Sequence, residues 1–116
     1  MPIQNFLDKQ PVEEICHNGE GWIKIVNLLD KELSAPIQFI HYTVLPPGTS
    51  IGLHTHKNDQ EIYIVLEGIG VIELNGKKTN VKCGDVILNK PFGSHALYNT
   101  LENQELKILV IEAVCL

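Results

Sequence analysis

The sequence predicts an all-β fold, a sandwich or barrel built from short antiparallel strands. Runs of β-branched and apolar residues recur at regular intervals, and groups of turn-forming residues separate them. Between two of these runs lies Asn75-Gly76, and a type I′ hairpin turn needs a positive φ at both central positions. The strands are expected at Trp22–Leu28, Ile37–Leu45, Ile51–His56, Glu61–Leu66, Gly70–Leu74, Thr79–Lys82, Val86–Leu88, Ser94–Asn99 and Glu105–Ala113.

The order of elements follows from the turn residues. Residues 1 to about 20 precede the first expected strand and are interpreted as an N-terminal arm, and VNLLDKEL, residues 26–33, fits either the end of a strand or a helical turn. The later strands are separated by Pro46-Pro47-Gly48, Lys57-Asn58-Asp59, Glu67-Gly68, Cys83-Gly84-Asp85, Pro91-Phe92-Gly93 and Glu102-Asn103. A chain of 116 residues without internal repeats is expected to form a single domain.

The composition is typical of a soluble globular protein. Hydrophobic residues make up 44% of the chain and charged residues 20%, and no apolar run is long enough to span a membrane. The N-terminus lacks the basic and apolar regions of a secretory signal. Three widely spaced cysteines fit free thiols in a reducing compartment, and Cys16 and its neighbour His17 are interpreted as structural or incidental. We therefore expect a cytoplasmic protein.

The charge pattern limits the possible partners. A net charge of −5 argues against nucleic acid, which needs a basic surface. All nine basic residues are lysines, so the planar fork of arginine that grips carboxylates and phosphates is missing. An anionic ligand would have to be held by a lysine, by backbone N–H groups or by a metal.

Two histidines and a glutamate are predicted to converge near one turn. His54 and His56 face the same way on one expected strand, roughly 7 Å apart along it. Glu61 has the opposite parity, but a hairpin at the polar segment 57–60 would reverse the chain and place Glu61 opposite the histidines. Tyr63 would then share the face of Glu61. Burying this cluster without a cation would leave polar atoms without partners.

A second segment, GDVILNKPFGSHALYNT at residues 84–100, adds a third histidine. His95 follows the turn at Pro91–Gly93, and a barrel would bring it close to the first three side chains. Three neutral imidazoles and a carboxylate suit a divalent transition metal and leave one or two positions open for water or substrate.

These two segments resemble the motifs of the cupin superfamily. The first motif of the family is Gly, five residues, His-x-His, four residues, Glu, six residues and Gly, and it matches Gly48, His54, His56, Glu61 and Gly68 without a gap. The resemblance covers roughly residues 36–114, which would form the barrel. It implies a jelly-roll-like β-barrel, often homodimeric, with a metal in its mouth.

The second motif matches with one departure. Gly84, His95 and Asn99 are in register, but the proline and glycine positions of the family hold Lys90 and Phe92. Pro91 and Gly93 lie one residue late, so the turn before His95 is expected to differ while the ligand spacing is kept.

The resemblance also implies a ligand set. By position, His54, His56, Glu61 and His95 would bind manganese, iron, nickel, copper or zinc. The alternative is a barrel that has lost its metal and keeps these four side chains as hydrogen-bonded core residues.

Three further residues are candidates for a role beside the metal. His41 is a candidate acid or base if it faces the barrel interior, and a surface residue if it faces out. Tyr63 is a candidate pocket residue, although an aromatic side chain filling the core is the simpler interpretation. Asn99 shares the face of His95 and either orients a ligand or caps its strand. The final strand is apolar on both faces from Ile108 to Ile111, which favours a homodimer.

Two classes of function fit these features. The first is a metal-dependent enzyme acting on a small organic molecule, by oxygenase chemistry or by Lewis-acid chemistry such as isomerisation, decarboxylation, cyclisation or lyase action. The second is a non-catalytic protein that uses the metal and the barrel to bind a sugar or another metabolite.

Overall fold

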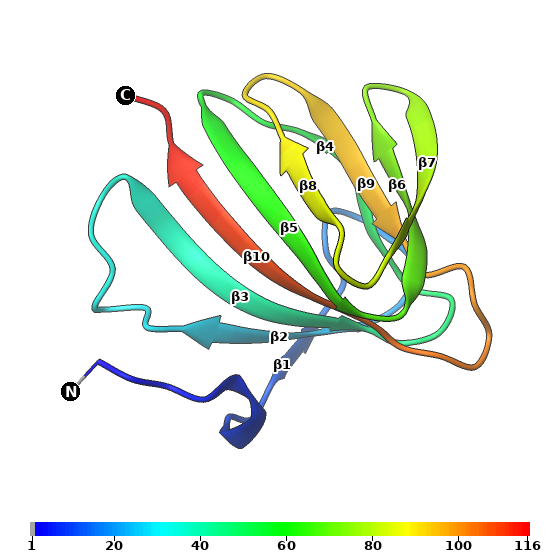
Figure 1. The fold of residues 1–116 in the computed structure, drawn as a ribbon, viewed down its shortest axis with the longest axis horizontal. Coiled ribbons are helices and arrows are strands. Elements are labelled where there is room, and N and C mark those ends of the chain that lie inside the picture. The colour runs from blue at the N-terminus through cyan, green and yellow to red at the C-terminus, as the bar shows by residue number, and fades with distance from the viewer. Residues whose placement is uncertain (1) are drawn as a thin grey trace.

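The computed structural model describes residues 2–116, which form ten strands and one short 3-10 helix (Figure 1). The elements are η1 (Phe6–Asp8), β1 (Val12–Glu14), β2 (Ile23–Leu28), β3 (Ile37–Leu45), β4 (Ser50–Thr55), β5 (Asp59–Glu67), β6 (Ile69–Leu74), β7 (Lys77–Lys82), β8 (Val86–Asn89), β9 (Ser94–Tyr98) and β10 (Leu106–Val114). No helix within this part of the chain has the length and apolarity needed to cross a membrane.

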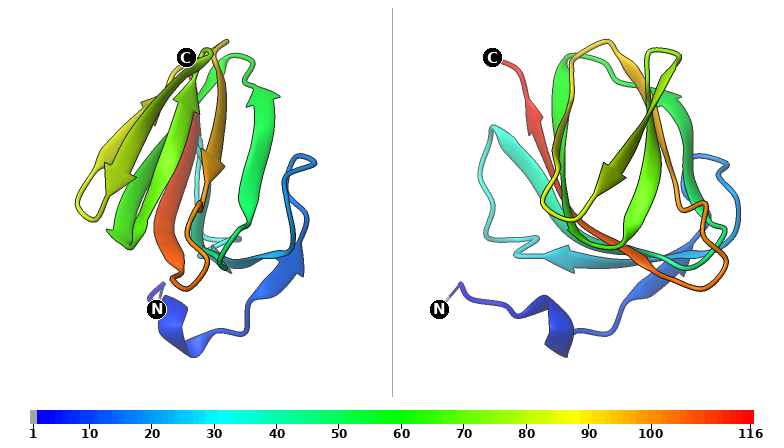
Figure 2. Two further views of the ribbon diagram at one scale, coloured as in Figure 1. Left: turned by 90° about the vertical axis from the view of Figure 1, so that its right-hand side faces the viewer. Right: turned by 45° about the vertical axis from the view of Figure 1, so that its right-hand side comes forward.

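The strands of residues 2–116 form two antiparallel sheets that curve around a shared interior (Figures 1 and 2). The larger sheet has the order β1-β2-β3-β10-β5-β8, and the smaller has the order β4-β9-β6-β7. Every pairing between neighbouring strands is antiparallel. The prediction of an all-β barrel is confirmed.

The interior changes from apolar to polar along β5. Glu61, Tyr63 and Val65 are buried, whereas the residues between them are more exposed, so alternate side chains point into the barrel. Val65 and Tyr63 belong to the main apolar core, which includes Leu45, Leu97, Leu106 and Ile108. At Glu61 the interior becomes polar, and this end of the barrel holds the candidate site.

The N-terminal arm covers part of the outer face of the larger sheet. Val26, Leu28, Tyr42 and Val44 form a second apolar cluster there, and Phe6 packs on Tyr42 with ring centroids 4.1 Å apart. Leu109 of β10 also packs against this cluster. The apolar outer side of β10, which favours a partner chain on sequence grounds, is therefore covered in part by the chain itself.

Two turns test the sequence predictions directly. Asn75 and Gly76 have φ values of 49° and 84°, so the predicted hairpin turn between β6 and β7 is confirmed. The predicted hairpin at 57–60 is wrong: β4 pairs with β9, β5 pairs with β10 and β8, and the chain crosses from one sheet to the other. Glu61 meets the histidines because the two sheets face each other, not because β4 and β5 are paired.

Candidate metal centre

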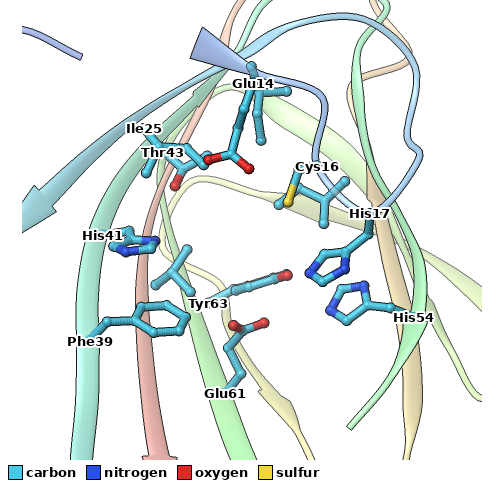
Figure 3. A pocket seen from close by; sticks show the side chains of 13 residues that line it. Glu14, Cys16, His17, Ile25, Phe39, His41, Thr43, His54, Glu61 and Tyr63 are labelled. Atoms are coloured by element: carbon cyan, nitrogen blue, oxygen red, sulfur yellow. The ribbon is translucent and has the colours of Figure 1, made fainter. Parts of the chain in front are cut away.

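A cavity of about 220 Å³ opens into the polar end of the barrel (Figure 3). Its walls combine apolar and ionisable side chains from both sheets and from the loop that follows β1. The lining residues are Glu14, Cys16, His17, Ile23, Ile25, Phe39, His41, Thr43, Ile51, His54, Glu61, Tyr63 and Val110. A second cavity of about 300 Å³ shares His17, Phe39, His54 and Glu61 with the first, and these four residues border both spaces.

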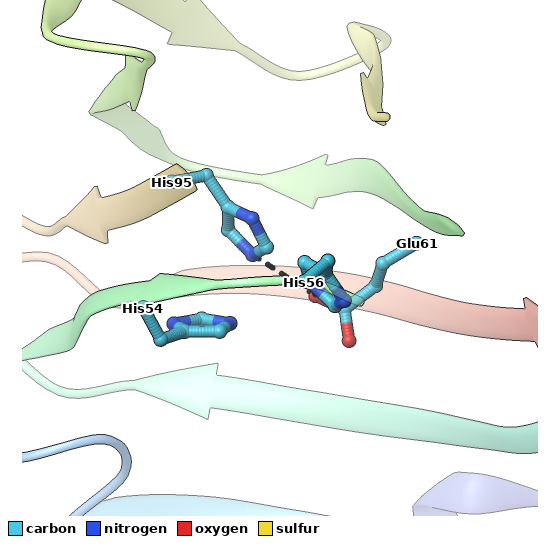
Figure 4. Close-up of side chains that lie close together, drawn as sticks. All are labelled: His54, His56, Glu61 and His95. Carbon is cyan, nitrogen blue, oxygen red and sulfur yellow. Dashed lines mark hydrogen bonds and ion pairs between the residues drawn. The ribbon is translucent and has the colours of Figure 1, made fainter. Parts of the chain in front are cut away.

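The four residues of the predicted ligand set come together beside this cavity (Figure 4). His54 on β4 is the cross-strand partner of His95 on β9, and Glu61 extends from β5 of the opposite sheet. His56 follows β4, and its backbone N–H donates to the carbonyl of Gly93 over 2.9 Å. One ligand atom from each of the four side chains lies within 4.8 Å of the others. His56, Glu61 and His95 are buried, and His54 is half-buried.

Neighbouring groups leave the Nε2 atoms of two histidines available for a cation. Nδ1 of His54 lies 2.7 Å from the carbonyl oxygen of Gly52, and Nδ1 of His56 lies 3.0 Å from a carboxylate oxygen of Asp59. Both acceptors favour the tautomer with the proton on Nδ1 and a lone pair on Nε2. Burial lowers the pKa of His54 to about 4, so this imidazole is neutral at neutral pH.

The donor set fits a divalent transition metal. Nε2 of His56 is buried 3.6 Å from a Glu61 oxygen, and among residues 2–116 it has no hydrogen-bond partner. Nε2 of His95 lies 3.1 Å from the same oxygen. Burial works to raise the pKa of Glu61, but the hydrogen bond and charge of His95 and the charge of His56 outweigh it, and the pKa lies below its usual value. A cation among these atoms would satisfy the unpaired nitrogen and offset the carboxylate.

Two further carboxylates lie behind His56. Its Nδ1 is 3.0 Å from Asp59 and 3.6 Å from Glu112, which is the cross-strand partner of Glu61. Burial, together with the nearby carboxylates of Glu61 and Asp59, raises the pKa of Glu112 to about 7. Carboxylates in this position orient a ligating imidazole and increase its basicity.

A family model for the cupin domain matches residues 41–112, which is more than half of the chain. The chain belongs to the cupin family. The match includes all four residues of the candidate metal centre and ends before Ala113.

Proteins similar to this chain have been described in several organisms. An "oxalate-binding protein" from Thermotoga maritima is 38% identical over 94 residues, which cover 80% of this chain and 77% of that protein. The crystal structure of a "predicted oxalate decarboxylase" from Thermotoga maritima superimposes with a TM-score of 0.93 at 30% identity, covering 97% of this cupin and 99% of that chain. The cupin domain of Cnp3 from Schizosaccharomyces pombe shares the fold alone, with a TM-score of 0.71 at 14% identity over 80% of this chain and 61% of that one.

His41, whose orientation the sequence leaves open, faces the cavity of this cupin. It extends from β3 and stacks on Phe39, with ring centroids 4.1 Å apart (Figure 3). Burial lowers the pKa of His41 below its usual value despite the nearby negative charge of Glu61. The imidazole is therefore predominantly neutral at neutral pH and able to accept a proton.

Tyr63 lines the cavity and also belongs to the apolar core, so it occupies both of the positions that the sequence leaves open for it. Its hydroxyl lies 3.0 Å from Nε2 of His95, and the side chain is almost fully buried. Burial and the carboxylate of Glu61 raise the pKa of Tyr63 well above its usual value, so its hydroxyl stays protonated.

Asn99 has a structural position instead of one beside a ligand. Its amide nitrogen donates to backbone carbonyls, and its amide oxygen accepts the N–H of Leu101. The three carbonyl groups belong to Leu45, Pro46 and Gln104. Of the two roles that the sequence leaves open, the structure supports the one that ties the end of its strand to neighbouring loops.

The second motif departs from the family at the turn before His95. Phe92, at the glycine position of the family, has a φ of 61° and a side chain that is 70% exposed. Its N–H donates to the carbonyl of Lys57 over 2.9 Å, which holds the turn against the segment after His56. A bulky residue rarely adopts this left-handed conformation. The spacing of the four candidate ligands is nevertheless kept.

Sequence reasoning assigns no site role to His17, but the structure places it against the candidate metal centre. Its ring stacks on that of His54 with centroids 3.5 Å apart and an angle of 11° between the ring planes. Glu14 and Cys16, from the same part of the chain, line the cavity as well. Strand periodicity carries no signal for these contacts because Cys16 and His17 lie in a loop between β1 and β2.

Proposed function

We propose that this cupin binds a divalent transition metal through His54, His56, Glu61 and His95 and acts on a small organic molecule held beside it. The observation that supports this most strongly is that one ligand atom from each of the four side chains lies within 4.8 Å of the others. One of these side chains, His56, has a buried Nε2 with no hydrogen-bond partner among residues 2–116. Manganese, iron, nickel, copper and zinc all suit a site of three imidazoles and one carboxylate.

A small carboxylate, with oxalate as the first candidate, is the proposed ligand. The relative from Thermotoga maritima that is 38% identical is described as an oxalate-binding protein. The cavity of about 220 Å³ has room for a small organic molecule such as oxalate. This chain contains no arginine, and no lysine lines that cavity among residues 2–116. The carboxylate therefore has to be held by the cation and by neutral hydrogen-bond donors.

The side chains around the cavity define what the protein contributes to chemistry. A bound divalent ion supplies a Lewis acid for a carboxylate or carbonyl oxygen, and a redox-active ion also permits oxygenase chemistry. Tyr63 offers a hydroxyl that remains protonated and lies 3.0 Å from Nε2 of His95. His41, on the β3 wall, is neutral and is the proposed acid or base. Phe39 and the isoleucines of the wall restrict water around the ligand.

A non-catalytic binding protein is the second candidate. The description of the Thermotoga relative refers to binding alone, which favours this alternative. The position of His41 in the cavity favours an enzyme, because a binding protein needs no acid or base there. Oxygenase and Lewis-acid reactions are both compatible with the site.

The first experiment measures the metal content of the protein by plasma mass spectrometry after purification without a nickel column. We expect about one first-row ion per chain in the parent protein and loss of that ion in His54→Ala and Glu61→Ala, because each variant removes one of four ligands. His41→Ala is the matched control and should keep the metal. A parent protein that contains no metal and takes up none on titration contradicts the proposal.

The same control variant separates the two candidate functions. If His41→Ala keeps its metal and still binds oxalate but no longer turns over a substrate of the parent protein, the enzyme is supported. A metal-loaded parent that binds oxalate and leaves it chemically unchanged supports the binding protein.

The homodimer and the cytoplasmic location stay predictions. Several large apolar side chains of the arm and the segment after it are exposed, which supports contact with a second copy. The most exposed of these are Ile3, Leu7, Val12 and Trp22. Cys16, Cys83 and Cys115 are unpaired in the part of the chain that the structure describes, as expected in a reducing compartment.

A further inference from the structure

The loop of residues 16–19, which contains His17, is held directly against β4. The carbonyl of Cys16 accepts hydrogen bonds from the N–H groups of Gly52 over 3.0 Å and Gly19 over 2.9 Å. A Cβ at Gly52 would lie 2.0 Å from the carbonyl oxygen of His17, and a Cβ at Gly19 would lie 2.2 Å from that of Ser50. Only glycine at both positions permits the backbones to approach so closely.

The loop also adopts a conformation that few side chains accept. His17 has a φ of 50° and Asn18 a φ of 58°, both in the left-handed region. Residues are held in this region when the surrounding structure determines their position, and they often occur at ligand sites. Here the consequence is that the imidazole of His17 is placed at the candidate metal centre.

Contacts with β4 and His54 fix the position of the His17 ring. The ring of His17 stacks on that of His54, with centroids 3.5 Å apart (Figure 3). Gly52, whose N–H donates to the loop, also accepts the Nδ1–H of His54 at its carbonyl oxygen over 2.7 Å. His17 borders both the cavity of 220 Å³ and that of 300 Å³, as do Phe39 and Glu61. A ligand in either space therefore lies beside this imidazole.

His17 also meets a chemical need of the proposed ligand. With no arginine in the sequence and no lysine on the 220 Å³ cavity within residues 2–116, that cavity depends on neutral donors for a carboxylate, whereas Lys57 lines only the 300 Å³ cavity. The ring of His17 does not belong to the group of four that can hold the cation, so its nitrogens are not committed to it. Residues 41–112, which match the cupin family model, do not include His17. This imidazole is therefore a feature of this chain outside the matched family region.

We propose that His17 binds the small carboxylate directly, donating a hydrogen bond to one of its oxygens. This role rests on the proposed function, because it requires a carboxylate at the metal centre. The simpler alternative is that His17 only packs against His54. The two differ in what the ring nitrogens do, since packing needs the ring alone.

Two variants distinguish these roles. His17→Phe keeps an aromatic ring for the stack and removes both nitrogens, and His17→Gln removes the ring but keeps an N–H donor. The binding of Mn²⁺ to the metal-free protein and of oxalate to the Mn²⁺-loaded protein is measured by calorimetry for the parent and both variants. Thermal unfolding of each metal-free protein shows that the variants are folded.

The proposal expects His17→Phe to bind Mn²⁺ as the parent does and to bind oxalate about tenfold or more weakly, because a hydrogen bond to a charged oxygen is lost. His17→Gln should recover part of the oxalate affinity. Parental oxalate affinity in His17→Phe overturns the role of His17 and leaves the proposed function intact. A Mn²⁺-loaded parent that binds no oxalate overturns the proposed carboxylate ligand and the role of His17 with it.

Discussion

Asn89 is a buried polar residue whose amide lacks hydrogen bonds. Its side chain is 2% exposed, and neither amide atom has a hydrogen-bond partner within residues 2–116. It lies on β8 as the cross-strand partner of Glu61, and with His95 it lines a separate cavity of about 230 Å³. An unpaired buried amide costs about 1–3 kcal/mol. Asn89 therefore lowers the free energy of unfolding at a position next to the candidate metal centre.

Replacing this amide with an apolar group should stabilise the metal-free protein. We expect Asn89→Leu to raise the free energy of unfolding by about 1–2 kcal/mol, because the unpaired amide is removed and the branched shape of the side chain is kept. Urea denaturation of the metal-free protein measures the change. Asn89→Ala, which removes the amide but leaves a cavity, is the control and should gain less. A clear loss of stability in Asn89→Leu would mean that the amide is satisfied by water in the 230 Å³ cavity.

At the scale of the element, local pattern predicts the strands well and their partners poorly. Expected and observed strands from β3 onward differ by a few residues at most, because alternation and turn residues are local properties of the chain. On β5 the burial of Glu61, Tyr63 and Val65 follows the predicted parity. The predicted pairing of β4 with β5 is wrong, since the choice of sheet depends on contacts between distant segments. The three-residue strand β1 was not predicted, because VEE has no apolar alternation.

The residues of the candidate site are likewise predictable from local sequence only in part. Spacing predicts that His54, His56 and Glu61 lie together, and the expected barrel and the second cupin motif add His95. The structure brings all four together. The orientation of His41 was left open because it depends on the register of β3, in which His41 pairs with Asn27 and Val110. The position of the loop that contains His17 depends on close backbone packing against β4. Neither strand alternation nor a sequence motif predicts that packing.

Gly52 on β4 provides a test of this backbone packing. The pairing of β4 with β9 shifts register between Ile51 and His54, and the loop of residues 16–19 lies against this irregular part of the strand. We expect Gly52→Ala to lower the free energy of unfolding by about 1–3 kcal/mol, because its Cβ would collide with the His17 carbonyl at 2.0 Å. Chemical denaturation measures the change.

Gly93→Ala is the milder control for Gly52→Ala, since its Cβ would lie 3.2 Å from the nearest backbone oxygen. The decrease in the free energy of unfolding should be smaller for Gly93→Ala than for Gly52→Ala. Equal stability of Gly52→Ala and the parent protein would show that the loop is free to move away from β4.

At the scale of the whole molecule, the candidate metal centre spans both sheets. His54 and His95 belong to the smaller sheet, Glu61 belongs to the larger one, and His56 lies on the connection between them. A cation bound to all four side chains would join the two sheets at the polar end of the barrel, next to the core residue Tyr63. The arm stabilises the larger sheet from the other side, through the contact of Phe6 with Tyr42.

Metal binding should therefore stabilise the whole fold. Because the unfolded chain cannot keep four distant side chains together, an ion that binds only the folded form adds about 2.7 kcal/mol at a free concentration one hundred times its dissociation constant. We expect the melting temperature of metal-free protein to rise with added Zn²⁺ or Mn²⁺ and to fall again with EDTA. His56→Ala should lose most of this shift, and His41→Ala, on the cavity wall outside the group of four, should keep it. If His56→Ala shows the same shift as the parent, the ion binds elsewhere on the protein, and the two sheets are held together by the apolar core alone.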